Sequence, residues 1–258
     1  VKDFITFQGT NLATGGSFDL VFDNGTLNSA SIPYPTIFTG DINDSTNFLS
    51  NPYPSAISTV DFFNVNSGIV DTIYLWNQAT PAAFDATGNE GANFSSSDYA
   101  VISASGINTA GGDLSLIPGD FVPSGQGFFI EALSGTSVTF NNSMRETGNN
   151  NQFFRSANTI DELTDSRQVL WLNLISDNGV AKQIAVAHLD GATNAYDGSL
   201  YDVKENLSTG NAALIYFVIA DSNTNKYVIQ GINVSSFDED EIIPIGFKTS
   251  IYVITLYK

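Results

Sequence analysis

Short segments in which apolar and polar residues alternate recur along the whole chain, and most of them end in a cluster of Gly, Asn, Asp or Pro. Because successive side chains of a strand point to opposite faces, this period of two predicts half-buried strands joined by turns. In the first half of the chain, the pattern predicts strands at Ser17–Phe22, Thr72–Trp76, Tyr99–Ser103, Gly127–Glu131 and Ser137–Phe140.

The second half continues the pattern, with predicted strands at Val169–Ile175, 183–189, 213–219, 226–231 and 250–256. The first two are separated by Asp177-Asn178-Gly179, and an Asn-Gly pair supplies the positive φ values that a tight hairpin turn requires. No long window has the period of an amphipathic helix, and short helical turns are expected only at 56–63 and 159–164. The sequence therefore predicts an all-β protein made of two antiparallel modules of β-sandwich or jelly-roll type.

The charged residues divide the chain into two parts of different character. Residues 1–150 carry 2 basic and 14 acidic side chains, whereas residues 151–258 carry 7 basic and 13 acidic ones. A run rich in Asn lies between the two parts, and Asn favours turns over regular structure. We therefore expect an N-terminal β module at 1–145, a linker region at 146–166 and a C-terminal β module at 167–258.

Composition argues against several classes of function. The 258 residues include 27 Asp and Glu but 9 Lys and Arg, so that the formal net charge is −18. Such an anionic surface repels nucleic acids and anionic lipid headgroups, and we expect neither as a partner. The absence of Cys and the presence of a single His, His188, exclude cysteine chemistry and sites with several histidines. No apolar run is long enough for a membrane-spanning helix, and we expect no membrane insertion.

The composition also favours a location outside the cell. Few Lys and Arg, abundant Asn, Ser, Thr and Gly, and no Cys suit a bacterial exterior in which disulfides are not used. The first residues, Val1-Lys2-Asp3-Phe4, lack the features of a signal peptide. Any targeting signal is therefore expected to have been removed or to lie outside this fragment.

Several blocks of sequence carry a family resemblance. The most distinctive is Asn51-Pro52-Tyr53-Pro54-Ser55-Ala56-Ile57, which Asp61-Phe62 soon follows. Further blocks lie in order at 72–76, 98–100, 124–129, 138–145, 151–155, 171–174, 191–197 and 244–249. From about residue 48 onward, the chain resembles the NPYPSAI-containing region of large Bacteroidetes proteins, mostly flavobacterial, that are exported by the type IX secretion system.

The resemblance implies a location more than a reaction. It implies an extracellular or outer-surface protein whose partner during export is the type IX translocon. Regions of this kind usually precede a small β-sandwich sorting domain, and we expect this chain to be truncated before it. No catalytic residue is assigned to the region, so that none is carried over, and we expect no enzyme activity.

We expect no cofactor, although acidic loops offer a candidate site for calcium. Calcium takes six to eight oxygen ligands, and two glycines in the favoured loop permit a tight wrap around the ion. The candidate ligands are Asp190, Asn194, Asp197 and Asp202. Further acidic clusters lie at 41–44 and 238–241. The alternative is that all of these are solvated turn residues, since none has the spacing of an EF-hand.

Other side chains are candidates for contact with sugars or for attachment of sugars. Trp76 is a candidate glycan-stacking residue, although Trp76 and Trp171 both lie in alternating strands, where burial is the alternative. Ser45 and Thr72 are candidate O-glycosylation sites, because Asp44-Ser45-Thr46 and Asp71-Thr72-Ile73 resemble the Bacteroidetes sequon Asp-Ser/Thr-apolar.

Three further features favour structural roles. The stiff segment Asn51-Pro52-Tyr53-Pro54 is interpreted as a turn, with a ligand platform as the alternative. Ser124-Gly125-Gln126-Gly127 is interpreted as a turn that enters a buried strand, because it lacks the context of a phosphate loop. His188 is expected to be a residue of a sheet face rather than a catalytic base.

The sequence thus predicts a non-catalytic secreted or cell-surface protein with a structural or adhesive role. Surface glycans and further copies of the same chain are the expected partners, the latter by strand addition at an open sheet edge. The alternative is a carbohydrate-binding accessory module of a secreted polysaccharide-degrading enzyme.

Overall fold

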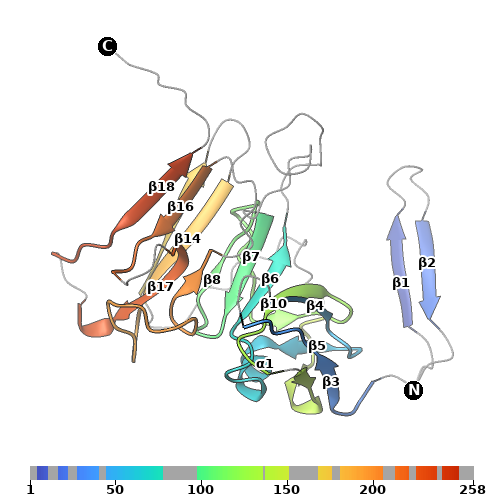
Figure 1. Ribbon diagram of the computed structural model, residues 1–258. Coiled ribbons are helices and arrows are strands. Elements are labelled where there is room, and N and C mark those ends of the chain that lie inside the picture. Colours follow the sequence, from blue (N-terminus) through green and yellow to red (C-terminus); the bar gives the residue numbers. More distant parts are fainter. Residues whose placement is uncertain are drawn as a thin grey trace.

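A computed structural model gives the fold, and almost all of its regular structure is β-strand (Figure 1). The structure describes residues 5–10, 17–22, 28–40, 45–77, 98–135, 137–150, 168–175, 181–205, 213–220, 225–236 and 240–249. Within these ranges, the only α-helix is α1 (Thr59–Val65), and the 3-10 helices η3 (Asn142–Met144) and η4 (Val234–Ser236) are single turns. None of these helices is long and apolar enough to cross a membrane. The prediction of an all-β protein is confirmed.

A five-stranded antiparallel sheet lies in the middle of the structure (Figure 1). Its strands are, in spatial order, β4 (Thr46–Ser50), β10 (Gly127–Glu131), β6 (Thr72–Trp76), β7 (Tyr99–Ser103) and β8 (Asn108–Thr109). Strands β6, β7 and β10 have the bounds that the alternating pattern predicts. The register places Phe129 opposite Phe48 and Tyr74, and Trp76 opposite Tyr99.

Three small antiparallel sheets accompany it. They are β11 (Ser137–Phe140) with β3 (Ile32–Pro35), β12 (Arg145–Glu146) with β5 (Ala56–Ser58) and β9 (Phe121–Val122), and β1 (Ile5–Thr10) with β2 (Ser17–Phe22). The predicted strands at Ser17–Phe22 and Ser137–Phe140 are confirmed with the same bounds. The β1–β2 hairpin stands apart from the other sheets in Figure 1.

Helix α1 forms where a short helical turn was expected, although the first residues of that stretch belong to β5. The Ser58 hydroxyl caps the helix by accepting a hydrogen bond from the Asp61 N–H at 3.2 Å. Phe62 is fully buried, with ring centroids 5.1 Å from Phe140 and 6.0 Å from Phe128. Phe63 is buried in the same core, so that the helix supplies two aromatic groups to the core beneath the five-stranded sheet. The second expected helical stretch, 159–164, lies outside the described residues.

A six-stranded sheet contains the described strands of the second half. Its strands are β13 (Val169–Ile175), β14 (Ala181–Leu189), β17 (Tyr227–Asn233), β16 (Ala213–Phe217) and β18 (Ile245–Thr249), with β15 (Val203–Lys204) on the edge of β17. Strands β13 and β14 pair antiparallel over seven residues, which confirms the predicted hairpin. Its turn, including Gly179, and the predicted strand at 250–256 lie outside the described residues. Strand β18 was not predicted.

One pairing corrects the prediction of purely antiparallel modules. Strands β14 and β17 run parallel, with Ala185 opposite Ile229 and Leu189 opposite Asn233. A parallel pair cannot be closed by a tight turn and needs a long crossover connection. The chain between the two strands provides it, because it passes through β15 and β16 before it enters β17.

Two apolar cores lie on the two faces of the five-stranded sheet. Ile73 and Phe128 belong to the first core, which also contains the buried residues of α1 and β11. Tyr74 belongs to the second core, together with Ile184 and Ile229 of the six-stranded sheet. Because side chains alternate along a strand, burial of neighbouring residues in different cores shows that the sheet is covered on both sides.

The second core contains residues from both sides of the predicted linker. Two hydrogen bonds reinforce this contact. The Trp171 indole N–H donates to the carbonyl of Asn108 at 3.0 Å, and the Ala110 N–H donates to Oε1 of the buried Gln183 at 2.8 Å. Residues 151–167 of the linker region lie outside the described residues, and the division into two modules stays a prediction.

The Asn51–Pro54 segment is a buried turn. The Asn51 amide donates to the carbonyls of Ser55 and Val122, both at 2.8 Å, and its Oδ1 accepts from the Tyr53 N–H at 3.0 Å. Tyr53 is buried, and its hydroxyl donates to the carbonyl of Ala30 at 2.6 Å. These contacts favour the structural interpretation over a ligand platform.

We predict that Asn51→Ala lowers the free energy of unfolding by about 2–4 kcal/mol, because it removes two buried hydrogen bonds, to the Val122 carbonyl and from the Tyr53 N–H, and a partly buried one to the Ser55 carbonyl. Denaturant unfolding measures this loss. The matched control is Asn28→Ala, which removes an exposed 2.9 Å hydrogen bond to the Pro52 carbonyl and should cost less than about 1 kcal/mol. Equal losses of unfolding free energy in the two variants would contradict the structural role that we assign to Asn51.

Candidate functional site

The face of the five-stranded sheet that belongs to the second core carries the candidate site. Alternate residues share this face, so that Phe129 and Glu131 of β10 lie on it with Tyr74 and Trp76 of β6. Aromatic rings gather at one end of the face, and ionisable groups gather at the other. The two ends differ in exposure and in chemistry.

An aromatic row, defined as Phe48, Phe129, Tyr99 and Trp76, runs across four strands. Successive ring centroids are 4.9, 5.8 and 4.9 Å apart in that order, and the pairs are tilted or edge-to-face, as aromatic quadrupoles favour. The two ends of the row are exposed, Phe48 by 65% and Trp76 by 37%. The two middle rings pack against the second core. The row therefore presents two apolar contact points on a rigid base.

Gly127 makes room for one end of the row. A Cβ added at residue 127 would lie 2.5 Å from Cζ of Phe48, which is closer than atoms of this kind can approach. The Phe48 ring therefore lies over the backbone of β10, where a side chain would otherwise stand. At the middle of the row, burial raises the pKa of Tyr99, and the nearby Asp98 carboxylate adds to the rise.

The sequence singled out one member of this row and missed three. Trp76, the candidate glycan-stacking residue, lies at the exposed end, and its role stays a prediction. Phe48, Phe129 and Tyr99 carry the same alternating signal as any core residue, and only the register of the strands brings them beside Trp76. Trp171 is partly buried and hydrogen-bonded to the other sheet, in agreement with the core alternative.

The opposite end of the face contains a buried polar cluster. We define it as Asp71, Tyr74, Glu131, Lys182, Ser199, Lys204 and Glu205. The Tyr74 hydroxyl donates to the Glu131 carboxyl, and the Ser199 hydroxyl donates to Oδ2 of Asp71. Nζ of Lys182 lies 2.6 Å from Oε2 of Glu205, and both side chains are buried. The cluster thus connects the five-stranded sheet with β14, β15 and the loop before β15.

Burial controls the acidity of this cluster. It raises the pKa of Glu131 to about 8, and the Asp71 carboxylate adds to the rise against the hydrogen bond from Tyr74 and the charge of Lys204. Burial also raises the pKa of Asp71, although hydrogen bonds from Ser199 and Thr72 oppose it. The pKa of Tyr74 lies well above its usual value because of burial and the acidic groups around it. Burial therefore opposes ionisation throughout the cluster, and its effect is largest at Glu131 and Tyr74.

The structure brings Asp197 and Asp202, two of the candidate calcium ligands, into one network. The Asp202 carboxylate is fully buried and accepts hydrogen bonds from the N–H of Asp197 at 2.7 Å and of Gly231 at 3.2 Å. The Asp197 carboxylate accepts from the N–H and the hydroxyl of Thr193. Both carboxylates thus receive N–H donors, and Asp202 pins the loop to β17.

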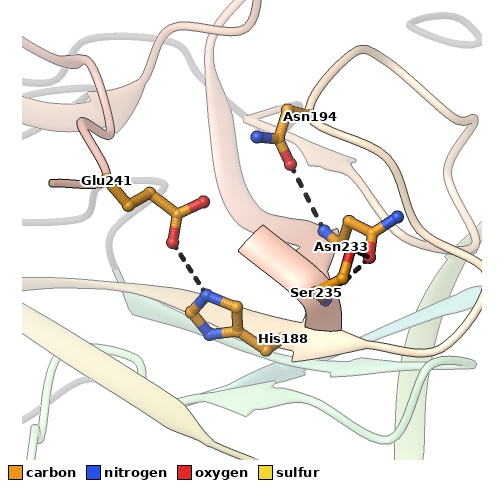
Figure 2. Close-up of polar contacts among 5 residues, drawn as sticks. All are labelled: His188, Asn194, Asn233, Ser235 and Glu241. Carbon is orange, nitrogen blue, oxygen red and sulfur yellow. Dashed lines mark hydrogen bonds and ion pairs between the residues drawn. The ribbon is translucent and has the colours of Figure 1, made fainter. Parts of the chain in front are cut away.

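The other two candidate ligands lie apart from this network. Asn194 Oδ1 accepts from the Asn233 N–H at 3.3 Å, and the Asn233 side chain accepts from Ser235 (Figure 2). Asp190 is exposed. Among the described residues, no three His, Asp or Glu side chains lie together as metal ligands would. The calcium site stays a prediction.

Both candidate O-glycosylation residues are buried. Ser45 is fully buried, and its hydroxyl accepts a hydrogen bond from the Thr39 N–H at 3.2 Å. Thr72 is buried beside the polar cluster, and its hydroxyl donates to Oδ1 of Asp71 at 3.1 Å. A sugar on either hydroxyl has no space in this packing, so that modification would have to precede folding or require local opening.

His188 lies on β14, as expected for a sheet residue. Its Nε2 lies 2.9 Å from Oε2 of Glu241, in the segment before β18 (Figure 2). The pair ties that segment to the sheet. Residues 41–44 and 238–239, which make up most of the other two acidic clusters, lie outside the described residues.

The fold and the site define an all-β protein with a row of aromatic side chains on one sheet. Over residues 3–256 the chain matches the family described as "Domain of unknown function (DUF8693)", and it belongs to that family. Comparison with curated proteins found no match, and comparison with solved structures found none.

We predict that Asp202→Ala lowers the free energy of unfolding by about 1–3 kcal/mol, because the Asp197 N–H in the loop loses its acceptor and the Gly231 N–H in β17 keeps only the Tyr201 carbonyl. The exposed Asp190→Ala serves as the control and should change stability by less than about 0.5 kcal/mol. Melting curves in millimolar calcium and in chelator test the calcium site on the same proteins. A bound ion raises the melting temperature by mass action, and an unchanged value would remove the calcium prediction.

Proposed function

We propose that this chain is a non-catalytic secreted or cell-surface β protein with a structural and adhesive role, which attaches through its aromatic row. The observation that supports this proposal is the pair of exposed rings, Phe48 and Trp76, held on a base of two packed rings. Large apolar groups on a protein surface mark contact sites when they gather in one place. The row also stands on strands, which fix its geometry better than loops would.

Neutral glycans are the ligands that suit this surface best. Aromatic faces stack on the C–H faces of sugar rings, and this contact needs no charge. The net charge of −18 disfavours anionic partners such as acidic polysaccharides or nucleic acids. Phe48 and Trp76 lie on strands separated only by β10, and the Phe48 ring lies over the β10 backbone between them. One short oligosaccharide can therefore contact both rings.

The alternative is a carbohydrate-binding accessory module of a polysaccharide-degrading enzyme. The same aromatic row favours it, because such a module also needs a sugar-stacking surface. The two proposals differ in their ligand. An accessory module binds a purified polysaccharide, whereas an adhesive protein binds a cell surface or further copies of itself.

The finer arrangement of the sheets is also a proposal. We propose that the sheets pack as β-sandwich or jelly-roll-like modules, and the second core supports face-to-face packing because it contains residues of two sheets. We further propose export by the type IX secretion system, which the NPYPSAI resemblance and the acidic, cysteine-free composition support.

We predict that the intact chain binds whole cells through the aromatic row, whereas the accessory-module alternative predicts micromolar binding to one class of purified neutral polysaccharide, as measured on a glycan array and by calorimetry. Trp76→Ala and Phe48→Ala should each weaken binding by about tenfold, which corresponds to the loss of ~1.4 kcal/mol of stacking energy. The matched control is Phe247→Ala, since Phe247 is 59% exposed on the edge strand β18 of the other sheet. It should leave binding unchanged.

Three outcomes separate the proposals. Binding to a purified polysaccharide that depends on Trp76 favours the accessory module. Binding to whole cells without binding to any purified glycan favours the adhesive protein, provided that Trp76→Ala abolishes it. If neither occurs, or if Phe247→Ala is as damaging as Phe48→Ala, the aromatic row is not the contact surface.

We predict that protease added to intact cells of the bacterium that produces this protein digests it. In a strain that lacks the type IX translocon, it should accumulate in the periplasm, because the outer-membrane step is blocked. Immunoblots of cell fractions measure both quantities. Recovery of the protein from the cytosol of normal cells would contradict the export proposal.

A further inference from the structure

The buried polar cluster is independent of the aromatic row and has an unbalanced set of charges. It contains the carboxyl groups of Asp71, Glu131 and Glu205 but only the ammonium groups of Lys182 and Lys204. Lys182 and Glu205 form an ion pair at 2.6 Å and so neutralise each other. Two carboxyl groups then remain beside one ammonium group, and of these three side chains that of Glu131 is buried while Asp71 and Lys204 are partly buried.

The second ammonium group, that of Lys204, also interacts with an aromatic ring. Nζ of Lys204 lies 5.0 Å from the centroid of Tyr196, within cation–π range, while its charge also acts on Glu131. If Asp71 and Glu131 were both ionised, the cluster would hold one uncompensated negative charge. A single bound proton removes it, because burying an unpaired charge is far more costly than burying a neutral acid.

The hydrogen bonds indicate which carboxyl group holds the proton. Both oxygens of Asp71 accept hydroxyl donors, Oδ1 from Thr72 and Oδ2 from Ser199. Glu131 is only 5% exposed, and its Oε1 has no hydrogen-bond partner among the described residues. Donors stabilise the ionised form of Asp71, and their scarcity at Glu131 favours its neutral form.

We propose that the buried polar cluster is a proton-binding site, centred on Glu131, that fastens the five-stranded sheet to the six-stranded one at neutral pH. Tyr74, Asp71 and Thr72 face Glu131 from β6 and the residue before it. Lys204, Glu205, Lys182 and Ser199 face the cluster from β15, β14 and the loop before β15. Loss of the proton leaves a buried carboxylate that repels Asp71 and weakens the contact between the sheets.

The sign of the pH dependence follows from the difference between the pKa of Glu131 in the folded state and its pKa in the unfolded state. The pKa of Glu131 is about 8 in the folded protein, against an ordinary value of 4.5 that the unfolded chain retains. The stabilisation is therefore complete below pH 4.5 and is lost as the pH rises through 8. Between these values the unfolded state has released a proton that the folded state keeps, so that the unfolding equilibrium constant rises about tenfold per pH unit.

The test is denaturant unfolding of the intact chain between pH 6 and 9. The wild type should lose stability up to pH 8 and then level off, whereas Glu131→Gln should lack this loss and exceed the wild type at pH 9. Glu146→Gln on strand β12 is the matched control for loss of one carboxyl group and should keep the wild-type profile. His188→Gln removes the one imidazole of the chain and should also keep it.

Infrared spectroscopy provides a second, direct measurement. At pH 7 the wild type should show the carbonyl band of a protonated carboxyl group, and this band should disappear above pH 9 and be missing from Glu131→Gln. The proposal is overturned if no carboxyl group of the wild type titrates above pH 6, an experiment that needs no variant to fold. It is also overturned if Glu131→Gln keeps the pH profile, or if His188→Gln alone removes it. None of these results depends on glycan binding.

Discussion

Burial of the five-stranded sheet on both faces is the constraint on which the rest of the structure depends. Each of its inner strands must supply apolar groups at even and at odd positions, and Thr72–Trp76 does so with Ile73 and Leu75 on one side and Tyr74 on the other. The first face is covered by α1 and by the small sheets β3–β11 and β5–β9–β12, and the second by the six-stranded sheet. A sheet covered in this way has little freedom to shift its register, since a slip of one residue would exchange the contents of the two cores.

The second face of this sheet passes from exposed aromatic rings to buried ionisable groups within a few residues. On β10, Phe129 belongs to the aromatic row and Glu131 belongs to the polar cluster. On β6, Trp76 belongs to the row and Tyr74 belongs to the cluster. The sheets therefore cover only part of the face. The uncovered part retains apolar rings that can contact a ligand, whereas the covered part retains polar groups that hold a proton.

The blocks that carry the family resemblance meet in the fold. Ser124 of one block donates to the carbonyl of Tyr53 in another at 2.7 Å, and Arg145 of a third lies 5.5 Å over the Tyr53 ring. Asn51 joins the same place to β9 through the Val122 carbonyl. These residues hold turns and strand ends together, which favours a structural role for the three blocks.

Local pattern by itself determined much of this protein. The period of two fixed the strands Thr72–Trp76, Tyr99–Ser103 and Gly127–Glu131, because alternation is a property of the strand itself. Charge and the absence of Cys limited the chemistry in the same way. The parallel pairing of β14 with β17 and the spatial order of the strands depend on contacts between distant residues, and no local pattern encodes them. The candidate site belongs to this second kind: Phe48 is brought near Trp76, and Glu131 is buried beside Asp71, only by the tertiary register. The exposure of a ring and the pKa of a carboxyl group depend on the residues packed around them, and only the tertiary structure brings those residues together.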